Sequence, residues 1–174
     1  MKIKRILALI CACLTVLSLV SCNKTEEVPE GMKKISDDSV AYDFFVYTHW
    51  LVDDGVTDCA YFSESDRSNV SMSSYFPDAS HETVQDFYNA TIATYKRDFN
   101  NFTIIEEGTT DMHVFDAYQI VYTFTFGETT YKVYQSMTLR DTVMYMFTYT
   151  SSPELYDVHI EEVLKMLAEL KFRA

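Results

Sequence analysis

The sequence predicts an α+β domain, an α/β/α sandwich whose central antiparallel sheet has six to seven strands and two helices. Three observations support this: two segments with apolar residues at helical spacing, an unbroken apolar/polar alternation from residue 118 to 126, and short turns between consecutive strand patterns. Strands joined by short turns must be antiparallel, and amphipathic helices need a sheet face to cover. The expected order is three strands, a helix, four strands and a helix (βββαββββα).

The first three strands are expected within the segments SVAYDFFVY (39–47), CAYFSE (59–64) and SNVSMSSYF (68–76). Each is short and rich in β-branched and aromatic residues, which fit a pleated, half-buried surface. These segments precede the first helical pattern, so they account for the first group of strands.

The two helices are expected in SHETVQDFYNATIATYKRDF (80–99) and SSPELYDVHIEEVLKMLAEL (151–170). Ser80 is the expected N-cap of the first helix, while Ser152 can cap the second and Pro153 suits its first helical position. The apolar positions, spaced by three or four residues, are Val84, Phe87, Tyr88, Ile92, Tyr95 and Phe99 in the first helix and Tyr156, Ile160, Val163, Leu164 and Leu167 in the second.

The second group of strands is expected at 102–107, 118–126, 129–139 and 143–150, with turns at Gly127-Glu128 and at residues 140–142. The last three form a meander. Val121 and Met146 are apolar residues on the faces that the alternation marks as polar. They indicate that a helix covers each face of the sheet.

Residues 1–21 have the three parts of an export signal: a basic start with Lys2, Lys4 and Arg5, a short apolar run, and small residues. The run from residue 6 to 20 is too short for a helix across a bilayer core of about 30 Å. The order Leu-Val-Ser-Cys ending at Cys22 resembles a bacterial lipobox. We therefore expect cleavage before Cys22 and acyl chains, palmitate among them, on a bacterial lipoprotein.

The division expected is a signal peptide at 1–21, a lipidated tether at 22–34 and a single domain at 35–174. Removal of residues 1–21 takes three of the 14 basic residues and none of the 26 acidic ones, leaving a formal charge of −15. Such a charge repels phosphate backbones, so nucleic acid is not an expected partner. The expected partners are the membrane, through the lipid on Cys22, and an unknown protein or small ligand, with the domain itself monomeric.

Few residues of the sequence are candidates for catalysis or metal binding. Cys11 and Cys13 leave with the signal, so Cys59 has no partner for a disulfide, and its apolar surroundings favour a packing role over a nucleophile. His159 with Glu161 or Glu162 is interpreted as part of a solvated helix face rather than a metal pair. The sequence Asp-Asp-Gly at 53–55 is interpreted as a turn. No catalytic residue, cofactor or metal is indicated.

The segment 35–173 resembles the PsbP-like family in its element order and in local patterns such as YDFFVYTHW, FDAYQIVYTF, YKVYQSM and MFTYTSSPELYDVH. The resemblance implies an α/β/α sandwich over an antiparallel sheet. It implies no shared catalytic motif that could be transferred to a position in this chain.

Two functions are compatible with these sequence features. The first is a non-catalytic accessory or binding module, lipid-anchored to the extracytoplasmic face of the cell membrane. The second is an exported hydrolase whose carboxylates or histidines converge only in the fold, as acid pairs distant in sequence can. A pocket with at least two convergent titratable groups would favour the second.

Overall fold

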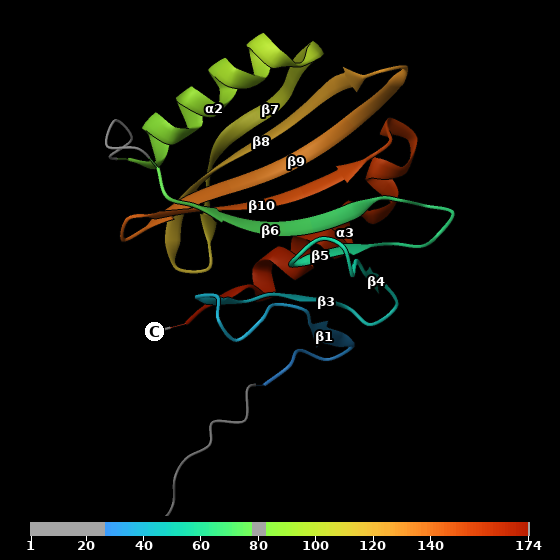
Figure 1. Cartoon of the computed structure of the whole chain (residues 1–174), viewed down its shortest axis with the longest axis vertical. Helices are drawn as coiled ribbons and strands as arrows, with labels where there is room; N and C mark the ends of the chain where they lie inside the picture. Colours follow the sequence, from blue (N-terminus) through green and yellow to red (C-terminus); the bar gives the residue numbers. More distant parts are fainter. Residues whose placement is uncertain (1–26, 78–82, 174) are drawn as a thin grey trace, which may run out of the picture.

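The main sheet has seven antiparallel strands, as predicted, in the order β4-β5-β6-β10-β9-β8-β7 (Figure 1). The computed structural model describes residues 27–77 and 83–173. The strands of this sheet are β4 (Leu51–Val52), β5 (Cys59–Tyr61), β6 (Asn69–Tyr75), β7 (Asn100–Met112), β8 (Phe115–Phe126), β9 (Thr129–Arg140) and β10 (Val143–Ser151). The strand β7 lies at one edge, where it pairs with β8.

The two helices, α2 (Val84–Asp98) and α3 (Pro153–Glu169), cover opposite faces of this sheet, which confirms the sandwich. Ile120 on β8 packs in the core under α2, whereas its neighbour Val121 packs against the core under α3. Met146 and Phe147 on β10 divide in the same way. Because consecutive residues of a strand face opposite sides, a sheet covered on both faces buries both sets.

The helix α2 begins at Val84 with Thr83 as its N-cap, so the expectation of Ser80 as the cap was wrong. Thr83 and Asp86 form a capping box, in which the Thr83 hydroxyl accepts from the Asp86 backbone and the Asp86 carboxylate accepts from the Thr83 backbone. This arrangement satisfies two of the backbone N–H groups that a helix start leaves free. In helix α3, Ser152 occupies the N-cap position and Pro153 follows it, as expected, but the Ser152 side chain makes no capping hydrogen bond.

The segment 42–47 differs from the prediction, because it contributes no strand to the main sheet. It forms β2 (Tyr42–Asp43), which pairs with β11 (Lys171–Phe172), and β3 (Phe45–Tyr47), which pairs with β1 (Met32–Lys34). These short ladders lie on the α3 side of the molecule, where the segment is almost fully buried. The strand β4, which the sequence pattern did not predict, completes the main sheet instead.

The N-terminal prediction lies largely outside the described residues, and Cys22 with it. Within them, Met32–Lys34, which were assigned to the tether, form β1 and pair with β3. The division of the chain into signal, tether and domain stays a prediction. The part of the chain that the structure describes contains no helix long and apolar enough to cross a membrane.

The C-terminus closes the fold through Arg173. Its guanidinium donates to Asp43 Oδ1 at 2.5 Å and to the backbone carbonyl of Asp38 at 2.8 Å. The Asp43 carboxylate also lies 3.2 Å from Lys34 Nζ. Arg173 therefore holds the segment from Asp38 to Asp43 in place.

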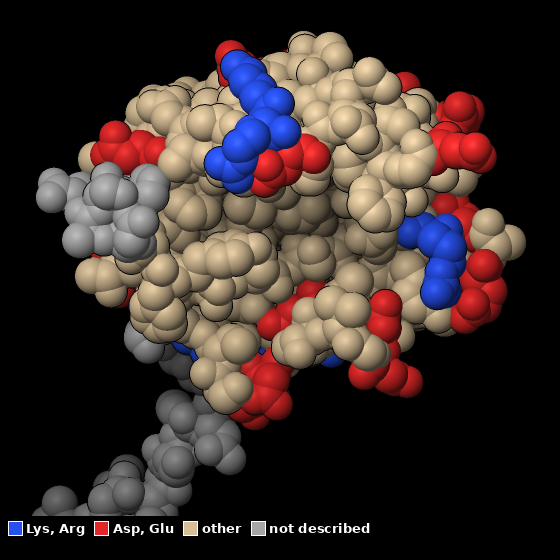
Figure 2. Space-filling model, turned by 45° about the horizontal axis from the view of Figure 1, so that its top comes forward, with Lys and Arg blue, Asp and Glu red and all other residues tan. Residues whose placement is uncertain are grey.

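Figure 2 shows how charge is distributed on one face of the molecule: acidic side chains are spread around its rim, and the basic ones form small groups beside acidic ones. A hollowed, uncharged region lies between them. This surface agrees with a chain that has 26 acidic and 14 basic residues.

Candidate functional site

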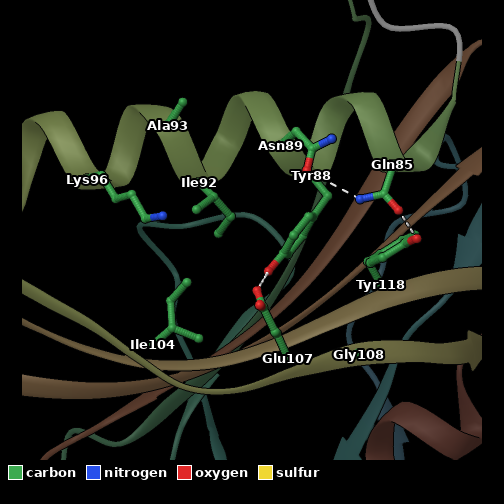
Figure 3. A pocket seen from close by; sticks show the side chains of 10 residues that line it. All are labelled: Gln85, Tyr88, Asn89, Ile92, Ala93, Lys96, Ile104, Glu107, Gly108 and Tyr118. Atoms are coloured by element: carbon green, nitrogen blue, oxygen red, sulfur yellow. Dashed lines mark hydrogen bonds between the residues drawn. The ribbon is translucent and has the colours of Figure 1, made fainter.

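A cavity of about 560 Å³ lies between α2 and the strands β7 and β8 at the sheet edge (Figure 3). Ligand pockets in proteins typically have volumes of about 300 to 1,000 Å³, so this one is large enough for a small molecule or several side chains. Its lining residues are Gln85, Tyr88, Asn89, Ile92, Ala93, Lys96, Ile104, Glu107, Gly108 and Tyr118. We call it the α2 pocket.

Hydrogen bonds fix the polar groups at one end of the α2 pocket. The Tyr88 hydroxyl donates to Glu107 and the Tyr118 hydroxyl donates to Gln85 Oε1. Gln85 Nε2 in turn donates to Asn89 Oδ1 at 3.3 Å. The rings of Tyr88 and Tyr118 stack with centroids 5.2 Å apart. Burial, and then the Glu107 carboxylate, raise the pKa of Tyr88, so its hydroxyl stays protonated and keeps donating.

Two charged groups of the α2 pocket have no countercharge among the described residues. Lys96 makes no hydrogen bond or ion pair with them, and Glu107 accepts only the neutral Tyr88 hydroxyl. Ile92 and Ile104 supply apolar surface near Lys96. The pocket therefore presents an ammonium, a carboxylate and side-chain amides around an apolar patch, which suits recognition of a polar or charged group.

The α2 pocket contains one hydroxyl–carboxylate contact, from Tyr88 to Glu107, and the raised pKa of Tyr88 keeps that hydroxyl protonated and a poor nucleophile. The lining of the pocket holds one carboxylate, one ammonium and two tyrosines, and the basic Lys96 lies at the opposite end from Tyr118. A two-carboxylate hydrolytic site needs a second acid within about 5 to 10 Å of the first. The geometry therefore favours binding over acid–base hydrolysis at this site.

A second cavity, of about 340 Å³, lies on the other face of the same strands, under α3. Ile105 and Glu106 of β7 line it, so the two cavities share β7 as a common wall. Across it, Lys132 Nζ lies 3.1 Å from Asp157 Oδ1 and 4.0 Å from the centre of the Tyr156 ring. We call it the α3 pocket.

A β-bulge in β7 determines which of the adjacent residues Glu106 and Glu107 faces each pocket. The pairing with β8 shifts between Ile104 and Glu106, which leaves Ile105 as the extra residue. From there, Glu106 lines the α3 pocket and Glu107 lines the α2 pocket. The two adjacent carboxylates thus lie on opposite faces of the sheet edge.

His159 does not lie on a solvated helix face, so that interpretation was wrong. Its side chain is 4% exposed, and its Nε2 lies 2.7 Å from Asp66 Oδ2 in the loop before β6. The ring of Phe62 packs against the imidazole at 4.1 Å, and Trp50 lies beside it. Burial raises the pKa of Asp66, but hydrogen bonds from Ser68 and His159 outweigh that effect and lower it.

Glu162, the proposed neighbour of His159 on that face, contacts other residues. Its Oε2 accepts from Trp50 Nε1 at 3.1 Å and lies 3.2 Å from His49 Nε2. His113 occupies the β7–β8 turn with a φ of 58°, and His81 lies outside the described residues. Among residues 27–77 and 83–173, no group of three or more His, Cys, Asp or Glu side chains could hold a metal ion.

Cys59 lies in β5 and is buried, as expected for a packing residue. Burial, and then the charge of Asp53, raise the pKa of its thiol. The Asp53 carboxylate also accepts from the Gly55 backbone at 2.9 Å, which confirms the turn at 53–55. A raised pKa keeps the thiol protonated and unreactive near neutral pH.

The sequence patterns considered above did not identify the residues of the α2 pocket. Gln85, Asn89, Ile92 and Lys96 follow one another at spacings of four, three and four, so three polar residues share a helical line with Ile92 of the apolar stripe. That line could have indicated the helix side of the pocket. The sequence did not indicate that Glu107 faces this pocket, because its orientation depends on the bulge at Ile105.

Comparisons with known proteins give relatives in structure only. No protein-family model and no curated protein sequence matches the chain. A Pseudomonas aeruginosa protein of unknown function is similar in structure, with a TM-score of 0.61 and 14% identity over 82% of this chain and 98% of the other. The cyanobacterial PsbP of a Synechocystis species gives a TM-score of 0.57 and 15% identity, over 88% of this chain and 98% of the other.

LpqN of Mycobacterium tuberculosis, a protein involved in cell envelope biogenesis, gives a TM-score of 0.51 and 11% identity, over 85% of this chain and 82% of the other. At such identities, similarity establishes the fold and carries no residue role across. The fold is therefore PsbP-like, as the sequence patterns suggested. The fold alone does not determine the function, which depends on the residues of the site.

Proposed function

We propose that this protein is a non-catalytic binding module, held by a lipid on Cys22 at the extracytoplasmic face of the membrane, and that the α2 pocket receives a polar or charged group of its ligand. The observation that supports binding at this site is the pair of charges without countercharges among the described residues, Lys96 and Glu107, in a cavity of about 560 Å³. Unpaired charges at a surface site are available to a ligand of complementary charge.

The anchor is supported by the sequence around Cys22 and by the kind of protein that shares the fold. LpqN, which shares the fold, is involved in cell envelope biogenesis. Acyl chains stabilise membrane binding by about 0.8 kcal/mol per buried methylene, so the acidic domain needs no basic patch to remain at the membrane. The anchor and the pocket then have separate tasks.

The His159–Asp66 pair does not support the hydrolase alternative. Two aromatic rings pack beside His159, and its Nε2 is engaged by Asp66. A general base must reach the proton of a nucleophile or water in a substrate-accessible site. The α2 pocket, where a ligand fits, contains neither of these two residues.

Binding at the α2 pocket can be tested by nuclear magnetic resonance with small probes that carry an ammonium and a carboxylate, such as free amino acids and amino sugar acids. We expect shifts confined to α2 and β7, and at least tenfold weaker binding for Asn89→Trp, which blocks the pocket lining. Thr94→Trp is the matched control, because Thr94 is exposed on the same helix and does not line the pocket.

The proposal would be abandoned if neither small charged probes nor peptides bound to the protein. It would also fail if Asn89→Trp and Thr94→Trp bound a probe equally well, because binding would then lie elsewhere.

A further inference from the structure

The edge strand β7 separates two cavities and has no strand on its outer side among the described residues. It pairs with β8 alone, and from Glu106 to Met112 its pairing with β8 is continuous, without further bulges. In a strand paired on one side only, alternate residues direct their backbone N–H and C=O groups away from the sheet. Seven consecutive residues of β7 therefore offer a regular edge to another strand.

The two pockets lie where the side chains of such an added strand would go. Successive residues of a strand point to opposite faces, so neighbouring side chains would enter the α2 pocket and the α3 pocket in turn. Recognition of this kind takes affinity from backbone hydrogen bonds and specificity from pockets on alternate side chains. Ile105, 55% exposed at the bulge, adds apolar surface beside them.

The charges of β7 select the partner. Glu106 faces the α3 pocket, Glu107 faces the α2 pocket, and neither forms an ion pair with a described residue. Opposite charges directly across two strands stabilise their pairing, and like charges destabilise it. A second copy of β7 aligned at these residues would set carboxylate against carboxylate, so a cationic partner is favoured.

We propose that β7 binds an extended peptide segment of a partner protein as an eighth strand, and that the segment carries two adjacent basic residues. One basic side chain pairs with Glu107 in the α2 pocket and the next pairs with Glu106 in the α3 pocket. This inference rests on the proposed function, since it names the ligand class for the α2 pocket, and it adds the α3 pocket to the same site.

The test is calorimetric titration of the full-length protein, in detergent, with the synthetic peptide acetyl-Thr-Val-Thr-Lys-Lys-Thr-Val-Thr-amide. A peptide of the same composition, acetyl-Thr-Val-Lys-Thr-Lys-Thr-Val-Thr-amide, is the first control, because its two lysines point to one face of a strand. The second control is the first peptide methylated at its two central backbone nitrogens, which blocks both of its edges.

We expect the adjacent-lysine peptide to bind at least fivefold more tightly than the spaced one and at least tenfold more tightly than the methylated one. In the protein, Glu106→Gln and Glu107→Gln should each weaken binding about threefold to tenfold. Glu128→Gln is the matched control, because Glu128 is an exposed carboxylate in the β8–β9 turn. Hydrogen exchange of the outward-directed amides between Glu106 and Met112 should slow when the peptide binds.

Several results would overturn the inference. Equal binding of the methylated peptide would show attraction by charge without strand addition. A dimer that Ile105→Asp dissolves would show that β7 pairs with a second copy. If small charged probes bind the α2 pocket and none of the peptides does, strand addition is wrong while the proposed function stands.

Discussion

Replacing His159 by alanine should destabilise the protein strongly, because His159 is buried and hydrogen-bonded to an ionised partner. The loss of a hydrogen bond to a charged group costs about 1.5 to 3 kcal/mol. Removal of the ring from its packing against Phe62 and Trp50 adds about 2 kcal/mol. The total, about 3.5 to 5 kcal/mol, is a large part of the 5 to 15 kcal/mol typical of a domain.

The measurement is urea unfolding at pH 7, together with thermal unfolding, where a loss of this size lowers Tm by about 10 to 20 °C. His49→Ala is the matched control, since the His49 side chain is 48% exposed and its contact with Glu162 is a surface pair. We expect that control to cost less than about 1 kcal/mol. The reasoning is refuted if the two substitutions cost the same.

The pH dependence provides a second check. Because the pKa of Asp66 is lowered in the folded protein, its ionised form contributes stability that is present above the unfolded pKa of about 4. That contribution is lost as the pH falls through the lower folded value. The difference between the wild type and Asp66→Asn should therefore shrink below about pH 4, and a constant difference down to pH 2 would contradict the assignment.

Three further predictions concern the anchor, the buried thiol and the C-terminus. Cys22→Ser should leave uncut precursor without lipid label, and label on that variant would disprove the anchor. Cys59→Ala should cost about 1 to 2 kcal/mol in urea unfolding, and native Cys59 should resist alkylation at pH 7; rapid alkylation would show that it is accessible. Arg173→Ala should cost about 1 to 3 kcal/mol through its bond to Asp43, against no measurable loss for the exposed Arg97→Ala; equal losses would contradict the role of Arg173 in closing the fold.

The sequence predicted the region from 118 to 151 best, because local rules determine it. Two-residue turns such as Gly127-Glu128 set the register of neighbouring strands, and Gly127 takes the positive φ of 61° that such turns need. The alternation of side chains then determines which residues each helix covers. Nothing far away in the chain is needed to reach that result.

The segment 42–47 was predicted less well, because an apolar run shows that a segment is buried but not which strands it pairs with. Its partners, β1 and β11, lie at the two ends of the domain. His159 illustrates the same limit. It follows Tyr156 by three residues and precedes Val163 by four, so its burial could have been inferred from helical spacing, whereas its partner Asp66 lies 93 residues away.

Prediction of the candidate site requires knowledge of such distant pairings even more than prediction of the fold does. The α2 line from Gln85 to Lys96 is visible in the sequence, but the wall opposite it requires the register of β7 on β8. A single extra residue at the bulge decides that Glu107 faces the α2 pocket and Glu106 the α3 pocket, and not the reverse. No short-range pattern in the sequence determines that shift.

The closing contact of Arg173 also dictates the order in which the chain can complete its folding. Phe44, Phe45 and Val46 are fully buried, yet they pack among α3 and the strand β11, which follow them by more than 100 residues. A chain that emerges with its N-terminus first exposes these side chains until α3 and β11 have also emerged, and such exposure favours aggregation. Loss of Phe172 and Arg173 would therefore lower the yield of folded protein as well as the stability of the folded state.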